Sequence, residues 1–143
     1  MNKTGKIGRI LRLLLGIFFV TEIYPVYLEV TLEGFLIRLG WTLALVVFYV
    51  LVQIYVSKYL PNINKVIGAI LAIGPFLAVF FIGYGGPAAT GALTFIAVSL
   101  IIAAIRADSG CEVMSIPALI LGKNTHLCCI VFSPIDFIEK AIK

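Results

Sequence analysis

The residues best suited to chemistry lie in the last third of the chain. Three thiols and the single imidazole of the sequence are supplied by Cys111, His126, Cys128 and Cys129. Thiolates and imidazoles are the ligands that select zinc, copper and other soft metals. The C-x-x-C spacing is missing, and adjacent cysteines in an extended segment point to opposite faces, so one ion reaches both only across a turn. These four residues are candidate metal ligands, and we predict no other cofactor.

The same cysteines fit three other interpretations. The run Leu127–Phe132 is apolar enough for cysteine to serve there as a small buried hydrophobe, which is the interpretation we favour. The thiols are also candidates for redox chemistry, although a cytoplasmic location disfavours a permanent disulfide. Cysteines next to a membrane span are in addition candidates for palmitoylation.

A second set of polar residues interrupts the apolar stretches. Gln53 lies in one stretch, and Thr90 and Thr94 lie in another, so the three form a candidate polar pathway. No Asp, Glu, Lys or His lies in the middle of these stretches, where such residues normally mark ion and proton pathways. Glu22 is the best remaining candidate for a functional charge. The sequence has no Gly-rich phosphate loop, Ser/His/Asp set or paired carboxylates at depth, so we predict no catalytic residues and no enzyme.

Composition places all of these residues in a membrane protein. Of the 143 residues, 62% are hydrophobic and 13% are charged, and the mean hydropathy is +1.13. This composition excludes a large soluble enzyme and a folded extramembrane domain. The net charge of +4 is better explained by membrane topology than by nucleic acid, because basic residues collect on the cytoplasmic side of membrane spans.

Four segments are predicted to cross the membrane, at about 8–27, 39–57, 66–83 and 88–105. The last three approach the roughly 20 apolar residues that cross about 30 Å of hydrocarbon as a helix. The first has a short apolar core, Leu13–Val20, but counting it as a span places ten of the eleven basic residues on one side. Arg12 and Glu22 then have to snorkel towards opposite interfaces. We predict an all-α four-helix bundle in the cell (inner or plasma) membrane, with both termini cytoplasmic.

Aromatic residues mark both predicted interfaces. Tyr24, Tyr27 and Trp41 flank the outer interface, and Tyr55 and Tyr59 lie at the inner end of the second span, where amphipathic rings are favoured. These positions agree with the orientation deduced from the charges.

Two features predict how the spans pack. Pro75 in the third span should kink that helix, because proline removes a backbone donor and crowds the preceding turn. Small residues on successive turns of the fourth span should let a neighbouring backbone approach closely, within the bundle rather than across a dimer; they are Ala88, Ala92, Ser99, Ala103 and Ala107.

Residues 111–143 are predicted to form a membrane-associated cytoplasmic tail after the transmembrane domain, residues 1–110. One short helix should start at Ser115 and end at Gly122, and a second, amphipathic one should start at Ser133. Ile116–Ile120 and Leu127–Phe132 are too apolar to stay in water and too short to span. We expect them to dock on the cytoplasmic face of the membrane or against the bundle.

The opening segment Asn2–Gly16, with its arginines Arg9 and Arg12, resembles the start of the small rhodanese-associated inner-membrane domain family of bacteria. Gly8 stands where that family usually has an acidic residue, so the salt bridge of that acid is missing. Gly110 and Cys111 are similar to the cysteine region after the family's second helix. The resemblance implies a self-associating helical hairpin close to sulfur-transfer chemistry, with Cys111 as a sulfur-handling residue.

Three functions remain open from the sequence. The leading hypothesis is a non-enzymatic accessory or scaffold subunit of a membrane complex, with membrane lipid and other membrane subunits or further copies of itself as partners, and no nucleic acid. The first alternative is an oligomeric carrier or channel for a small neutral or sulfur-containing species, lined by Gln53, Thr90 and Thr94. The second alternative is a thiol or soft-metal site on the tail.

Overall fold

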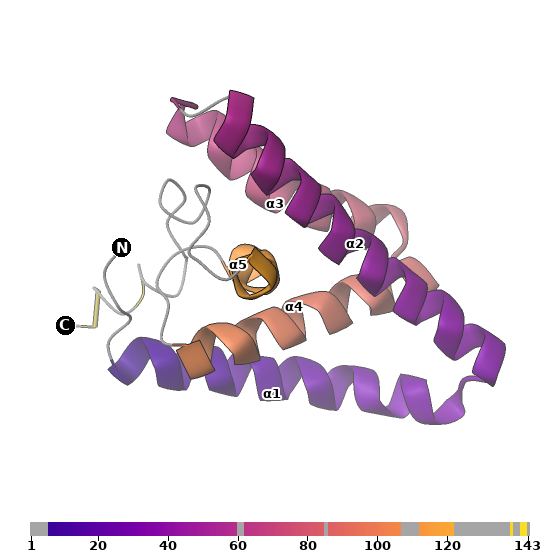
Figure 1. The fold of residues 1–143 in the computed structure, drawn as a ribbon. Helices are drawn as coiled ribbons and strands as arrows, with labels where there is room; N and C mark the ends of the chain where they lie inside the picture. Colours follow the sequence, from indigo (N-terminus) through magenta and orange to yellow (C-terminus); the bar gives the residue numbers. More distant parts are fainter. Residues whose placement is uncertain are drawn as a thin grey trace.

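The protein is a bundle of four long helices with a short fifth one. The computed structural model describes residues 6–59, 62–84, 86–106, 112–121, 138 and 141–142. The helices are α1 (Lys6–Glu29), α2 (Leu32–Tyr59), α3 (Lys65–Ile82) and α4 (Pro87–Arg106), followed by the 3₁₀ turn η1 (Glu112–Met114) and α5 (Ser115–Leu121) (Figure 1). All four long helices have the length and apolar composition needed to cross a membrane. The predicted all-α class and multi-pass membrane character are confirmed.

Helix α4 is the centre of the molecule. In its span 56% of the residues are buried, against 11–17% in the other three helices. It packs against α1, α2 and α3, whereas α1 contacts mainly α4 and runs antiparallel to it (Figure 1). The small residues predicted on α4 explain this position, because Ala88, Ala92 and Ser99 are all buried.

The two helix pairs form a wedge. Figure 1 shows α1 and α4 diverging from the α2–α3 hairpin, with the narrow end near the starts of α2 and α4. Gly91 lies near the narrow end, and one turn further along α4 Phe95 stacks on Tyr49 of α2 with ring centroids 5.5 Å apart. Side-chain size therefore increases along the α2–α4 interface, and the helices move apart accordingly.

The chain's own η1–α5 segment fills the wide end of the wedge. Figure 1 shows α5 nearly end-on between α4 and the α2–α3 pair, and it contacts α2 and α4 while η1 contacts α3 and α4. Val113, Met114, Ile116 and Ala118 are buried there. The predicted docking of this part of the tail against the bundle is thus confirmed, although Leu119 and Ile120 are exposed. The Leu127–Phe132 run and the start of the helix predicted at Ser133 lie outside the described residues.

Helix α2 begins earlier than the predicted span. It starts at Leu32 rather than Leu39, so that only Val30 and Thr31 separate it from α1. Glu33 lies in its first turn, where a carboxylate is favoured by the positive end of the helix dipole, and Gly34 does not interrupt it. The 28 residues of α2 extend over about 42 Å at about 1.5 Å per residue, longer than the roughly 30 Å hydrocarbon core. The helix therefore tilts or extends beyond the hydrocarbon.

Pro75 lies inside α3, which continues as an α-helix on both sides of it. Proline has no N–H, so the local hydrogen-bond ladder of α3 is interrupted. The next amide, that of Phe76, donates a hydrogen bond of 3.0 Å to the hydroxyl of Tyr49 on α2. Tyr49 is fully buried, and its ring and hydroxyl together link α2 to both α4 and α3.

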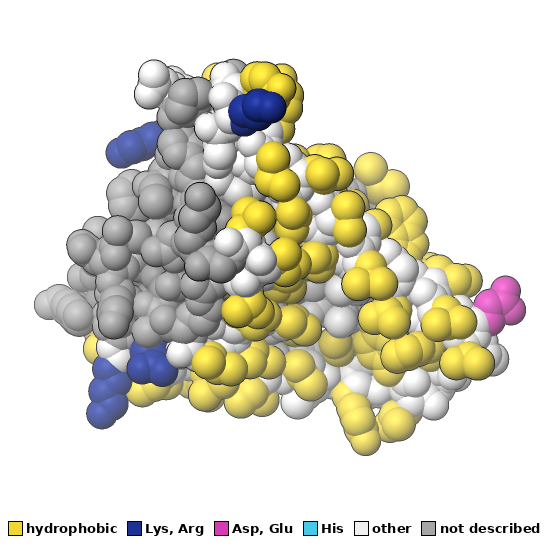
Figure 2. Space-filling model, viewed as in Figure 1, with side chains coloured by type: hydrophobic (Ala, Val, Ile, Leu, Met, Phe, Trp, Pro, Cys, Tyr) yellow, Lys and Arg dark blue, Asp and Glu magenta, His cyan; other side chains and the backbone are white. Residues whose placement is uncertain are grey.

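The outer surface matches a lipid environment. Large apolar side chains on the outer faces of the long helices are exposed, including Leu14, Phe18, Leu51 and Ile70. In the view of Figure 2 hydrophobic side chains form a broad band, with Lys and Arg at one end of the molecule and an acidic side chain at the opposite tip. A band of this kind between charged ends is typical of a protein embedded in a bilayer.

Candidate functional site

The four candidate metal ligands, Cys111, His126, Cys128 and Cys129, lie outside the described residues. Within the part of the chain that the structure describes, no group of three or more His, Cys, Asp or Glu side chains comes together in a way that could hold a metal ion. The thiol and soft-metal interpretation therefore stays a prediction from the sequence.

Gln53 points into the protein interior. Its side chain is buried on α2, and its amide Nε2 donates a hydrogen bond of 2.5 Å to the hydroxyl of Ser57 one turn further on. Ser57 belongs to the same helix, so this bond satisfies part of the amide without requiring a water-filled path. Gln53 is thus held in a closed part of the bundle.

Thr90 and Thr94 lie on α4, and Thr94 contacts α1. The Thr94 hydroxyl donates 2.9 Å to the carbonyl of Thr90 and lies 2.6 Å from the hydroxyl of Tyr27 on α1. Thr90 donates in turn to the carbonyl of Gly86, at 3.4 Å. Gln53 is on α2 and both threonines are on α4, and the polar pathway formed by the three stays a prediction.

The predicted snorkelling of Arg12 is wrong, whereas the predicted interfacial position of Tyr27 stays a prediction. Tyr27, near the end of α1, is half-buried, and its hydroxyl is bonded to that of Thr94 on α4. Arg12 is fully buried and engaged in interactions of its own, so it does not snorkel to the membrane surface. The reason is its position on α1: Gly8, Arg12, Gly16 and Ile23 are the buried residues of that helix, spaced so that they form the face packed on α4. Glu22 is exposed, as predicted for an interfacial acid.

The helices are tied together where a polar side chain meets a backbone carbonyl. The hydroxyl of Thr42 on α2 donates a hydrogen bond of 2.9 Å to the carbonyl of Gly91 on α4. The Nε of Arg9 on α1 donates one of 2.9 Å to the carbonyl of Ala104 on α4. Interhelical bonds of this kind stabilise membrane bundles, whose helices gain little from the hydrophobic effect alone. The buried Ser99 hydroxyl is without a hydrogen-bond partner in the described part of the chain.

Two glycines allow these close approaches. A Cβ atom on Gly91 would lie 2.6 Å from Cβ of Trp41 and 2.8 Å from the carbonyl oxygen of Arg38, both on α2. On Gly16 of α1 it would lie 2.8 Å from Cγ1 of Ile101 on α4. The alanines of α4 were predicted to allow close packing and these two glycines were not, although small residues among long apolar ones mark such contacts.

An apolar groove runs along the outside of the α2–α3 hairpin. It has a volume of about 310 Å³ and is lined by Trp41, Ala44, Leu45, Phe48, Pro75, Ala78 and Val79. Ala44 and Ala78 leave the hollow, because their side chains end at Cβ while the aromatic rings beside them project further. The groove faces outward along two predicted spans, and its walls offer almost no polar group. Such a surface accepts an acyl chain or the side chains of another helix.

Comparison with known proteins adds no relative: no family model, curated protein or solved structure matches the chain. The resemblance of the N-terminal helix to rhodanese-associated inner-membrane domains therefore stays a prediction.

Proposed function

We propose that this multi-pass membrane protein is a non-enzymatic accessory or scaffold subunit, which holds a transmembrane helix of a partner in the α2–α3 groove. The observation that carries the proposal is the groove itself, an outward-facing hollow with alanine floors and aromatic sides. Small residues flanked by large ones let a second helix approach closely, and packing is the main force that joins helices in lipid.

The use made of polar residues supports a structural role. The side chains that a carrier would need are bonded to other side chains of the protein: Gln53 to Ser57, and Thr94 to Tyr27. The wide end of the wedge is occupied by η1 and α5 of the same chain. The bond between Tyr27 and Thr94 joins α1 to α4 and helps to fix their arrangement, and a rigid arrangement is what a scaffold requires.

Filling the groove should remove the partner without unfolding the subunit. Ala44→Trp places an indole in the hollow, whereas Leu51→Trp puts the same side chain on an exposed position of α2 outside the groove. After purification in mild detergent, the wild-type protein and Leu51→Trp should keep a stoichiometric companion. The affinity of Ala44→Trp for this companion should fall at least tenfold, which is about 1.4 kcal/mol of binding free energy.

Mass spectrometry of the purified complexes checks this prediction and names the companion, which is either another subunit or a second copy of this chain. A lone monomer in all three preparations contradicts the scaffold role. Equal retention by Ala44→Trp and Leu51→Trp places the partner elsewhere on the surface.

We further propose that the end of the molecule carrying Lys6, Lys58 and Lys65 is cytoplasmic. These exposed lysines lie at the start of α1 and on either side of the α2–α3 connection, whereas Glu29 and Glu33 flank the α1–α2 turn. Reporter fusions at Lys65 and Lys143 should read as cytoplasmic and a fusion at Gly85 as external, because positively charged connections are retained inside. A C-terminal fusion that reads as external overturns this orientation.

A further inference from the structure

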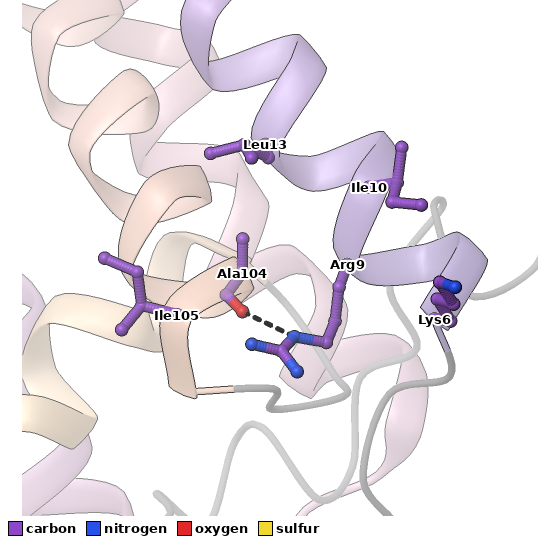
Figure 3. A pocket seen from close by; sticks show the side chains of 6 residues that line it. All are labelled: Lys6, Arg9, Ile10, Leu13, Ala104 and Ile105. Atoms are coloured by element: carbon purple, nitrogen blue, oxygen red, sulfur yellow. Dashed lines mark hydrogen bonds between the residues drawn. The ribbon is translucent and has the colours of Figure 1, made fainter.

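A second hollow lies between the first two turns of α1 and the end of α4 (Figure 3). It has a volume of about 610 Å³ and is lined, among the described residues, by Lys6, Arg9, Ile10, Leu13, Ala104 and Ile105. The four residues from α1 recur at intervals of one helical turn, so they form one stripe along the groove. We call this hollow the basic groove.

Arg9 is held in place within the basic groove. Its Nε donates 2.9 Å to the carbonyl oxygen of Ala104, one of the carbonyls in the last turn of α4 that have no partner within the helix (Figure 3). The bond uses only one of the five guanidinium N–H groups. The two terminal nitrogens have no acceptor among the described residues, and they remain available to a ligand with several oxygen atoms.

The rest of the lining is apolar. Ile10, Leu13 and Ile105 are 47%, 42% and 69% exposed, and they continue the groove from Arg9 along the two helices. Lys6 adds a second positive charge at its start, and the lining contains no acidic side chain among the residues described. The groove thus offers two cations at the charged end of the bundle and hydrocarbon beside the span.

We propose that the basic groove is a binding site for an anionic glycerophospholipid. The phosphate accepts hydrogen bonds from the terminal nitrogens of Arg9 and pairs with Lys6, and an acyl chain lies along Ile10, Leu13 and Ile105. Arginine suits this role because its planar fork matches two phosphate oxygens at once. A net negative headgroup is preferred over a zwitterionic one, because the two cations face no protein carboxylate in the lining.

Lipid retention by the purified full-length protein tests the proposal. The protein is exchanged into detergent with equimolar phosphatidylglycerol and phosphatidylcholine, and bound lipid is counted by native mass spectrometry. The wild-type protein should retain phosphatidylglycerol in preference. Lys6→Gln/Arg9→Gln should weaken its retention about 25-fold, at about fivefold for each basic residue removed near an anionic surface.

The matched control is Lys58→Gln/Lys65→Gln, which removes the same charge from the two sides of the α2–α3 connection. This variant should retain phosphatidylglycerol as the wild type does. Equal losses in the two double variants would mean that net charge attracts the lipid, and would overturn the site. Circular dichroism before and after exchange verifies that each variant is folded. Lys6→Gln alone keeps the bond between Arg9 and Ala104, and its expected fivefold loss tests the groove even if the double variant unfolds.

Two further measurements separate a lipid from a free anion. Leu13→Trp fills the apolar part of the basic groove without changing its charge, and should also release phosphatidylglycerol. Inorganic phosphate in millimolar excess should not compete, because it lacks the acyl chain. If phosphate displaces the lipid, or if Leu13→Trp retains it fully, the groove is an anion site only and the proposed lipid site is wrong.

Discussion

Replacing Gly91 with leucine should force α2 and α4 apart and lower the free energy of unfolding by about 2 to 4 kcal/mol relative to a matched substitution at Gly40. At Gly91 even a Cβ atom meets Cβ of Trp41 at 2.6 Å and the carbonyl of Arg38 at 2.8 Å. The carbonyl oxygen is part of the α2 backbone and the Cβ of Trp41 is bonded directly to it, so neither can turn away and the backbone has to move. The shift also breaks the 2.9 Å bond from Thr42 to the Gly91 carbonyl.

The control removes the effect of helix propensity. Gly40 also lies inside a helix, and a Cβ atom on it meets nothing within 4 Å. Both substitutions gain the same roughly 1 kcal/mol of propensity when glycine becomes leucine, so the difference between them measures the close approach alone. Unfolding followed by circular dichroism in mixed micelles gives both values. Similar stabilities for Gly91→Leu and Gly40→Leu would show that α2 and α4 do not touch at Gly91.

Replacing Met114 with aspartate should release η1 and α5 from the wedge. Met114 is fully buried in the cluster that includes Tyr49, Val56 and Phe95. Truncating a buried methionine typically costs about 2 to 5 kcal/mol, and a carboxylate without a partner in the same place costs more. The seven residues of α5 are too few to form a stable helix alone, so the released segment should also lose its helical hydrogen bonds.

Hydrogen exchange read by mass spectrometry measures this release directly. Amide protection across Glu112–Leu121 should fall to the level of an unfolded peptide in Met114→Asp, while α1 stays protected because it packs mainly on α4. Leu119→Asp is the control, since Leu119 is on α5 and exposed; it should keep the segment protected. A Met114→Asp variant with normal protection would mean that the tail is held by other contacts.

The four spans and the docking of residues near Ile116 could be predicted from the sequence, because both depend on the amount of apolar side chain along the chain. A run of about 20 apolar residues needs lipid, and a short apolar segment after the last span needs the bundle or the membrane surface. Exposed residues at the ends of the helices, such as Lys58 and Glu33, also lie where the charge pattern places them. The candidate thiol site could be proposed from residue types alone, and its geometry lies outside the described residues.

Tertiary structure alone decided which face of each helix is buried. In water an amphipathic pattern marks the buried face, but lipid is as apolar as a protein core, and a membrane helix can be apolar on every side. Arg12 looked like an interfacial residue for this reason, and the register of α1 on α4 placed it inside. The contact at Gly91 and the basic groove beside Arg9 likewise arise only when two helices meet. Each is built from residues far apart in sequence, and the local sequence of one helix does not indicate which residues of the other it will contact.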